Sequence, residues 1–90
     1  MAWRIEFDRA AVRELDRLDR QAARRILGFL NGRVANLEDP RSIGEALKGA
    51  KLGEYWKYRV GDYRVIAKIE DTELLILVIR IGNRREVYRT

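Results

Sequence analysis

Apolar and charged residues alternate at the start of the chain. Trp3, Ile5 and Phe7 fall on one side of an extended segment, with charged residues between them. Side chains of a strand point to opposite faces in turn, so this pattern predicts a half-buried strand over residues 2–7.

The next thirty residues carry two apolar stripes with the spacing of helices. Asp8 and Asp19 each precede one stripe, and each carboxylate can accept an amide hydrogen from the first turn of a helix. Pro40 lies just beyond the second stripe and discourages its continuation. The pattern predicts a helical hairpin joined near Asp19. Its two buried faces would be formed by Ala11, Leu15 and Leu18, and by Ala23, Ile26, Leu27, Leu30, Val34 and Leu37.

Residues 38–53 contain proline and several glycines and read as a loop. Residues 54–60 and 63–70 alternate like strands on either side of Gly61-Asp62, a two-residue hairpin turn in which glycine supplies a positive φ. Residues 74–81 are apolar at nearly every position, which is typical of a central strand covered on both faces. The predicted fold is a two-layer α+β domain over residues 1–90: an N-terminal strand, a helical hairpin and a three-stranded antiparallel meander.

The hairpin turn fixes which side chains share a face. With Gly61 and Asp62 at the turn, Arg59 stands opposite Arg64, and Lys57 lies on the same side of the sheet. The opposite face is apolar and would meet the helices, with Trp56, Tyr58, Val60, Tyr63, Val65 and Ala67. Like charges directly opposite each other destabilise a hairpin, so this face either binds an anion or is a solvated surface that Glu70 or Glu86 neutralises.

The tail adds further cations near the same sheet. Arg80, Arg84, Arg85 and Arg89 surround Tyr88. Arginine binds phosphate through paired N–H donors, and tyrosine can stack on a base or exchange a proton. The alternative is that Tyr88 closes the end of the core and the arginines are solvated.

Composition narrows the chemistry. The 90 residues contain neither cysteine nor histidine, which removes thiolate and imidazole ligands and the usual general base. The net charge is +5, and most of the excess lies in residues 40–90, with 11 basic against 7 acidic residues. A localised positive field suits nucleic acid, although it also suits a solubilising surface. No apolar run approaches the roughly 20 residues of a membrane helix, so we expect a soluble cytoplasmic protein with no cofactor and no metal.

RNA is a substrate that such residues can cleave, because it carries its own nucleophile, the 2′-OH. In-line attack on the adjacent phosphate requires charge stabilisation on the phosphorane, which arginine and lysine supply. Arginine is a poor acid or base, so an enzyme built this way should be slow unless a larger scaffold holds the RNA in line.

Three segments resemble a known family. Residues 55–65 (YWKYRVGDYRV), residues 81–88 (IGNRREVY) and the ALKG of residues 46–49, in this order of elements, resemble RelE toxins of the RelE/ParE superfamily. The resemblance covers essentially the whole chain. It implies a type II toxin–antitoxin toxin with the RelE-like fold, a metal-independent endoribonuclease that cuts mRNA in the ribosomal A site and inhibits translation.

The resemblance also assigns roles to residues. Lys57 and Arg59 match the basic pair before the turn, and Arg64 matches the arginine that contacts the scissile phosphate. The implied catalytic residues are Lys57, Arg59, Arg64, Arg84 and Tyr88. The expected RNA-binding residues are Lys48, Lys51, Arg80, Asn83 and Arg85. Many relatives have a histidine or lysine where this chain has Asn83, which puts a proton-transfer role there in doubt.

The implied partners are a RelB-like antitoxin, in a hetero-oligomeric complex, together with mRNA and the ribosome. Two alternatives remain open. ParE toxins share the fold but act on DNA gyrase without catalysis, and they typically lack the full catalytic set. A non-toxic RNA-binding relative is the third reading, and Asn83 is the feature that favours it.

Overall fold

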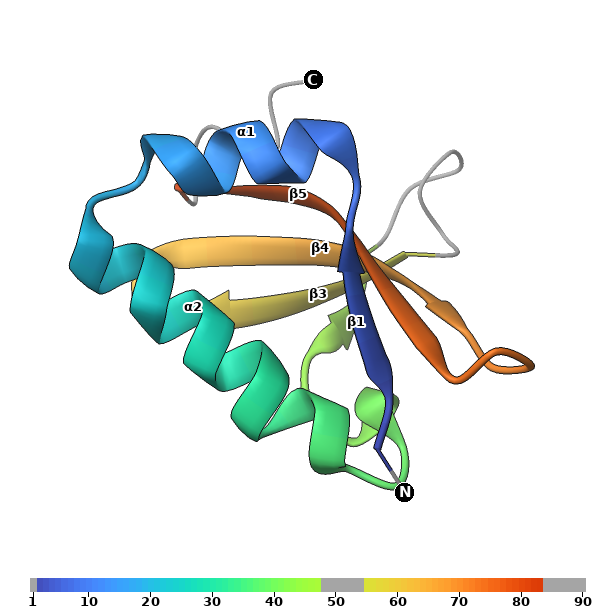
Figure 1. Cartoon of the computed structure of the whole chain (residues 1–90). Coiled ribbons are helices and arrows are strands. Elements are labelled where there is room, and N and C mark those ends of the chain that lie inside the picture. The colour runs from blue at the N-terminus through green and yellow to red at the C-terminus, as the bar shows by residue number, and fades with distance from the viewer. Residues whose placement is uncertain (1, 48–54, 84–90) are drawn as a thin grey trace.

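The computed structural model describes residues 2–47 and 55–83. Two helices lie against one face of a five-stranded sheet (Figure 1). In chain order the elements are β1 (Arg4–Phe7), α1 (Arg9–Arg17), α2 (Arg20–Gly32), the 3₁₀ turns η1 (Val34–Asn36) and η2 (Pro40–Ser42), β2 (Glu45–Ala46), β3 (Tyr55–Val60), β4 (Tyr63–Glu70) and β5 (Leu75–Asn83). The predicted two-layer α+β class is confirmed.

The sheet has the order β1-β5-β4-β3-β2. The predicted meander forms its antiparallel centre, β3-β4-β5. β1 pairs in parallel with β5, with Arg4 opposite Leu75 and Phe7 opposite Val78. Two parallel neighbouring strands need a long connection between them. Between β1 and β5 this connection consists of the helical hairpin and the other strands of the sheet. β5 therefore lies between two strands, as its apolar sequence predicts.

Both predicted helix caps are present. Asp8 accepts a hydrogen bond from the Arg9 amide at 2.9 Å, and Asp19 accepts one from the Ala22 amide at 2.8 Å. α2 ends at Gly32, earlier than its apolar stripe suggests. The Asn36 side-chain amide donates to the Gly32 carbonyl at 2.9 Å and so caps this end. The chain then tightens into η1, which keeps Val34 in the core.

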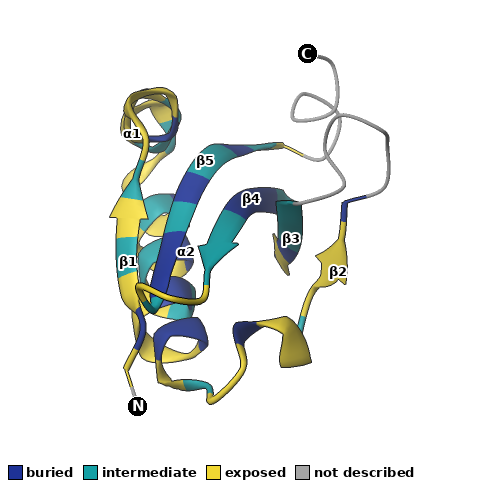
Figure 2. Cartoon of the chain, turned by 90° about the vertical axis from the view of Figure 1, so that its right-hand side faces the viewer, coloured by how far each residue is buried: buried dark blue, intermediate teal, exposed yellow. Residues whose placement is uncertain are grey.

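The main core lies between the helices and the sheet (Figure 2). Its fully buried members include Ala11, Ile26 and Leu30 from the helices and Tyr58, Val65, Ala67, Ile76, Val78 and Ile81 from the sheet. A second, smaller cluster pairs Leu47 with Ile66, and Tyr55 and Ile79 pack against it. Around Ile66 both faces of the sheet are therefore covered.

The segment predicted as a loop over residues 38–53 is partly regular. Residues 40–42 form η2, and β2 adds a short antiparallel strand to β3, with Glu45 opposite Lys57. The side chains of β3 hold this segment in place. The Tyr58 hydroxyl donates to the Pro40 carbonyl at 2.7 Å, and the Trp56 indole donates to the Ile43 carbonyl at 2.8 Å.

β5 differs from its predicted outline in two ways. The turn that precedes it spans residues 71–74 and ends at Leu74 with a positive φ of 49°, so the strand starts at Leu75. A register shift then separates Ala67, opposite Val78, from Ile66, opposite Arg80. Ile79 is the extra residue of this β-bulge, and such bulges redirect the side chains beyond them.

Candidate nucleic-acid interface

The β3–β4 hairpin has the predicted register. Arg59 stands opposite Arg64, Lys57 stands opposite Ile66, and the turn is Gly61-Asp62. Gly61 has a positive φ of 61° and is the only described residue of the turn with one, which is the pattern of a type II′ turn with glycine in its first central position. Two arginines are thus directly across from each other on one face.

Arg64 is the unusual member of this pair. Its residue surface is only 9% exposed, and Nη1 is the one buried side-chain nitrogen or oxygen among the described residues that lacks a hydrogen-bond partner. Burying a charge without a partner is costly, and the facing Arg59 adds repulsion instead of relieving it. A site that keeps such a group without an internal partner is ready for an anionic ligand.

The solvated reading of this face depended on two glutamates. The Glu70 carboxylate forms an ion pair with Lys68 at 3.2 Å and none with Arg59 or Arg64. Glu86 lies outside the described residues. Within the described ranges, neither Arg59 nor Arg64 has an ion pair with a carboxylate, which favours the anion-binding reading.

The hairpin cations line a pocket of about 360 Å³. Its walls come from the end of α2, the segment before β2, and the hairpin. They are formed by Phe29, Arg33, Ile43, Gly44, Glu45, Lys57, Tyr58, Arg59 and Arg64. Four cations and one carboxylate line it, so its net charge is about +3. The carboxylate, Glu45, lies 3.4 Å from Lys57.

The pocket lies where the pairing of β2 with β3 stops, at Glu45. If β2 continued toward its N-terminus, Ile43 would stand opposite Arg59. Instead of pairing with Arg59, the Ile43 carbonyl accepts a hydrogen bond from the Trp56 indole. Peptide groups along a strand alternate in direction, and the Tyr55 carbonyl points away from β4, toward the Leu47 amide. By this alternation the peptide N–H of Arg59 also points away from β4, beside the pocket.

Gly44 sets how closely the pocket wall approaches β3. Its φ is +82°, and a Cβ built there would lie 2.6 Å from the Lys57 carbonyl oxygen and 2.7 Å from the Trp56 indole nitrogen. A side chain would push the wall away from the strand. Sequence reasoning used this glycine only as a sign of a loop.

Tyr58 belongs to the wall as a structural group. Burial raises the pKa of its hydroxyl well above the ordinary value of 10.0, and the hydroxyl donates to the Pro40 carbonyl. A phenol held protonated in this way cannot act as a base at neutral pH. Its ring also meets Phe29 edge to face, with centroids 5.9 Å apart, which packs the end of α2 against β3.

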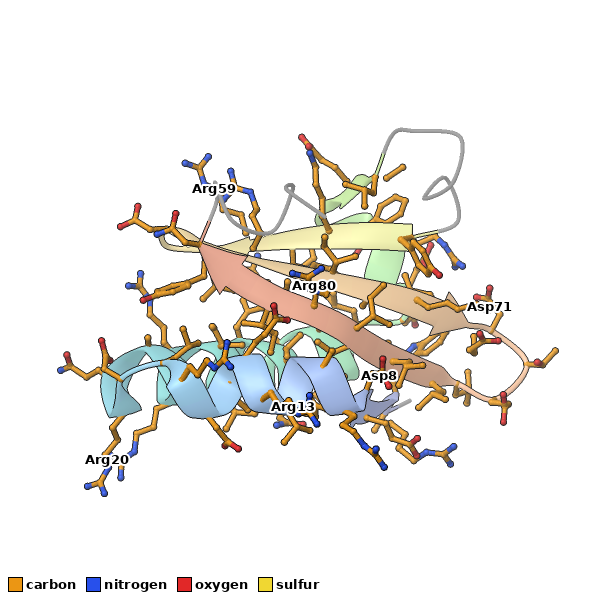
Figure 3. All side chains as sticks on the ribbon, turned by 90° about the horizontal axis from the view of Figure 1, so that it is seen from above. Asp8, Arg13, Arg20, Arg59, Asp71 and Arg80 are labelled. Atoms are coloured by element: carbon orange, nitrogen blue, oxygen red, sulfur yellow. The ribbon has the colours of Figure 1, made fainter. Side chains whose placement is uncertain are left out.

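Arg80 lies in different surroundings from the hairpin cations. Its Nε is 3.1 Å from the Glu14 carboxylate of α1, and Glu14 also accepts the Ile81 amide at 2.8 Å. β1 pairs with β5 only as far as Val78 and does not reach Ile81. Glu14 therefore accepts the Ile81 amide hydrogen in place of a neighbouring strand. Figure 3 shows Arg59 on the side of the sheet away from α1. Asn83 is exposed at the end of β5, opposite Tyr63.

The structure thus brings Lys57, Arg59 and Arg64 together and adds Arg33, Phe29 and Gly44, which sequence reasoning missed. Periodicity carries no signal for these three, because α2 and the loop meet the hairpin only in the folded chain. The remaining predicted site residues lie outside the described residues: Lys48, Lys51, Arg84, Arg85 and Tyr88.

Across residues 2–47 and 55–83, no three acidic side chains gather as metal ligands would. Neither α1 nor α2 has the length and apolar character of a helix that crosses a membrane.

Comparison with known proteins gives one consistent result. Residues 5–88 match the family model described as the ParE toxin of the type II toxin–antitoxin system parDE. The toxin RelE of Mycobacterium tuberculosis is 30% identical, over 97% of this chain and 87% of that protein. Toxin RelG of the same organism is 25% identical over 99% of both chains.

A solved structure agrees with these relatives. The toxin–antitoxin complex RelBE2 of M. tuberculosis contains a chain that superposes with a TM-score of 0.84 at 22% identity, covering 96% of this chain and 95% of that one. At this identity the likeness establishes the RelE fold alone. Together with the family match over nearly the whole sequence, it leads to one conclusion: this chain belongs to the ParE toxin family of the RelE/ParE superfamily and is a toxin of a type II toxin–antitoxin system.

Proposed function

We propose that this toxin is a ribosome-dependent endoribonuclease that cleaves mRNA in the A site. The observation that carries the proposal is the buried Arg64 guanidinium, which lacks a partner among the described residues and lines a pocket with Arg59 and Lys57. A phosphate of the mRNA would supply the missing acceptor.

The pocket suits the charge that develops during cleavage. The 2′-OH loses its proton to a base as its oxygen bonds to the neighbouring phosphorus, which builds a dianionic phosphorane. The bond to the 5′ oxygen then breaks and that oxygen takes up a proton, leaving a 2′,3′-cyclic phosphate and a 5′-hydroxyl. Arg64 and Arg59 would bind its equatorial oxygens, and Lys57 adds a third positive charge. A site of this charge would repel a divalent cation, so the proposed reaction uses no metal.

The requirement for the ribosome follows from what arginines cannot do. They stabilise charge but transfer protons poorly, and the sequence contains no histidine. The enzyme therefore depends on RNA already held near the in-line geometry, which a ribosome can impose on an A-site codon. A ribosome-dependent activity also requires a cytoplasmic protein.

The tail completes the proposed set. By the family resemblance, Arg84 would stabilise or protonate the leaving 5′ oxygen, and Tyr88 would orient the nucleotide or take part in proton transfer. The other proposed RNA contacts are Lys48, Lys51, Asn83 and Arg85. Arg80, bound to Glu14 in this structure, stays a weaker member of that group.

A RelB-like antitoxin is the proposed protein partner. The RelBE2 structure is a toxin–antitoxin complex with the same toxin fold. The pocket, with its net positive charge, suits an acidic segment of such a partner. Co-expression with the antitoxin encoded beside the toxin should relieve growth arrest, and the purified complex should not cleave mRNA.

The test is primer extension on a reporter mRNA in a purified translation system. Wild type should cut at A-site codons only when ribosomes are present, and Arg64→Ala should reduce cutting by about 10²- to 10³-fold, the range for losing one transition-state donor. Arg24→Ala, on the exposed surface of α2, is the matched control. Equal cutting by Arg64→Ala would remove Arg64 from the mechanism.

Gyrase inhibition is the second candidate, because the matching family model is named for ParE. It predicts no cuts by a folded toxin, inhibition of supercoiling by purified gyrase, and indifference to Tyr88→Phe. Ribosome-dependent cuts without any effect on supercoiling would exclude it.

A further inference from the structure

Arg33 is a pocket cation that neither the sequence motifs nor the family resemblance assigns. It follows α2 directly, its backbone amide still bonds to the Phe29 carbonyl at 3.0 Å, and its side chain lines the same pocket as Arg64. Among the described residues its guanidinium has no ion pair and no side-chain hydrogen bond. Glu45, the carboxylate in the pocket, already pairs with Lys57.

The charge of the pocket exceeds what one phosphate needs. With Lys57 offset by Glu45, three arginines remain: Arg33, Arg59 and Arg64. A phosphodiester in the ground state carries one negative charge, so a single phosphate would leave most of this charge unbalanced. Two successive phosphates of one RNA strand would match it better.

The position of Arg33 separates it from the pair that faces the cut. Arg59 and Arg64 are cross-strand neighbours on the hairpin, whereas Arg33 follows α2 and lines the same pocket from the helix layer. The pairing of β2 with β3 stops before it reaches Arg59, so β2 does not cover β3 at this point of the pocket. An extended strand that enters here would pass from one set of cations to the other.

We propose that Arg33 binds the phosphate next to the scissile one, so that the pocket holds two successive phosphates of single-stranded RNA. This inference rests on the proposed ribonuclease function and adds a positioning residue to it. Arg33 contacts a phosphate that does not react. It fixes the strand so that the neighbouring phosphate lies against Arg64.

The test combines Arg33→Gln with ribosome-bound mRNA carrying a neutral methylphosphonate one linkage 5′ or 3′ of the cut. Arg33→Gln should slow cleavage about tenfold, the effect of losing one charge-assisted hydrogen bond. On wild type, one of the two methylphosphonates should cause a similar loss. On Arg33→Gln the same substitution should cause no further loss, because the contact is already gone. Arg24→Gln, which changes an exposed arginine of α2 that does not line the pocket, should behave as wild type with every substrate.

The inference would be overturned if the losses from Arg33→Gln and from the methylphosphonate multiply at both linkages. Cleavage by Arg33→Gln at the wild-type rate would overturn it too. A second measurement separates it from the proposed function. A 2′-O-methyl oligonucleotide cannot be cut, so its binding can be measured at several salt concentrations. For Arg33→Gln the slope of log K against log salt should be shallower than that of wild type by about 0.7, and for Arg24→Gln it should equal that of wild type. If wild type fails to cleave yet this slope difference is found, the ribonuclease proposal fails and the phosphate contact stands; equal slopes for the two variants overturn the contact.

Discussion

Arg64 and Arg80 are both cations of the central sheet, yet their surroundings are opposite. Arg80 on β5 has a carboxylate, because Glu14 of α1 binds its Nε and the neighbouring Ile81 amide. Arg64 on β4 is more deeply buried and faces Arg59, with no carboxylate partner among the described residues. A cation that the fold has neutralised holds the structure together. A cation that the fold leaves unneutralised is kept at a cost in stability, which the proposed binding of an RNA phosphate would explain.

The largest expected effect is at Arg64. Arg64→Met keeps the volume and the apolar stem but removes the charge, so cleavage should fall by about 10²- to 10³-fold. The free energy of unfolding should rise by about 1 kcal/mol, since a buried charge without a partner and its repulsion with Arg59 are both removed. Arg80→Met should show the reverse, with lower stability and a smaller loss of activity. Urea unfolding and primer extension measure the two quantities. A less stable Arg64→Met protein would break the comparison.

Gly44→Ala should give the largest loss of stability. Alanine at a φ of +82° is strained, and its Cβ would overlap the Lys57 carbonyl and the Trp56 indole. We expect the free energy of unfolding to fall by about 2 to 3 kcal/mol, with weaker RNA binding because the pocket wall moves. Gly28→Ala is the control, as its Cβ would meet nothing within 4 Å. It should match or exceed wild-type stability because alanine favours a helix. Similar unfolding midpoints for the two variants would contradict this account of the wall.

Glu14→Ala sharpens the Arg80 side of the comparison. It removes the carboxylate that accepts from Arg80 Nε and from the Ile81 amide, which should cost about 1 to 2 kcal/mol of unfolding free energy. Asp16→Ala, on the exposed surface of the same helix, should cost less than about 0.5 kcal/mol. Thermal unfolding of both variants measures the difference. Equal melting temperatures would mean that Glu14 contributes only a surface charge.

The smallest effect is expected at Asp71, whose carboxylate accepts two hydrogen bonds of 2.9 Å from Arg41. The hydrogen bond from Arg41 lowers the pKa of Asp71 below its ordinary value of 3.8. The pair therefore stabilises the fold above about pH 4, and its contribution disappears as the pH falls through the lowered pKa. Asp71→Asn should melt slightly below wild type at pH 7, and the gap should close as the pH falls through the lowered pKa of Asp71. A gap in melting temperature that persists at low pH would come from something other than this charge.

Much of the site could be predicted because it depends on local rules. A two-residue turn at Gly61-Asp62 permits one close register, and that register places Arg59 opposite Arg64. Alternation then assigns the apolar face to the helices, and aspartates before apolar stripes mark where both helices begin. These features need only neighbours in the sequence, so the sequence determines them.

The tertiary structure decided what depends on distant residues. Parallel pairing of β1 with β5 has no local signature, and neither does the approach of Arg33 and Gly44 to the hairpin. In the sequence Arg80 looks like one more cation of the tail. In the folded chain, with a bulge at Ile79 and α1 nearby, its side chain binds Glu14. Whether a charge is paired depends on which groups meet after folding, and so only the folded chain distinguishes Arg80, which a carboxylate binds, from Arg64, which no described carboxylate reaches.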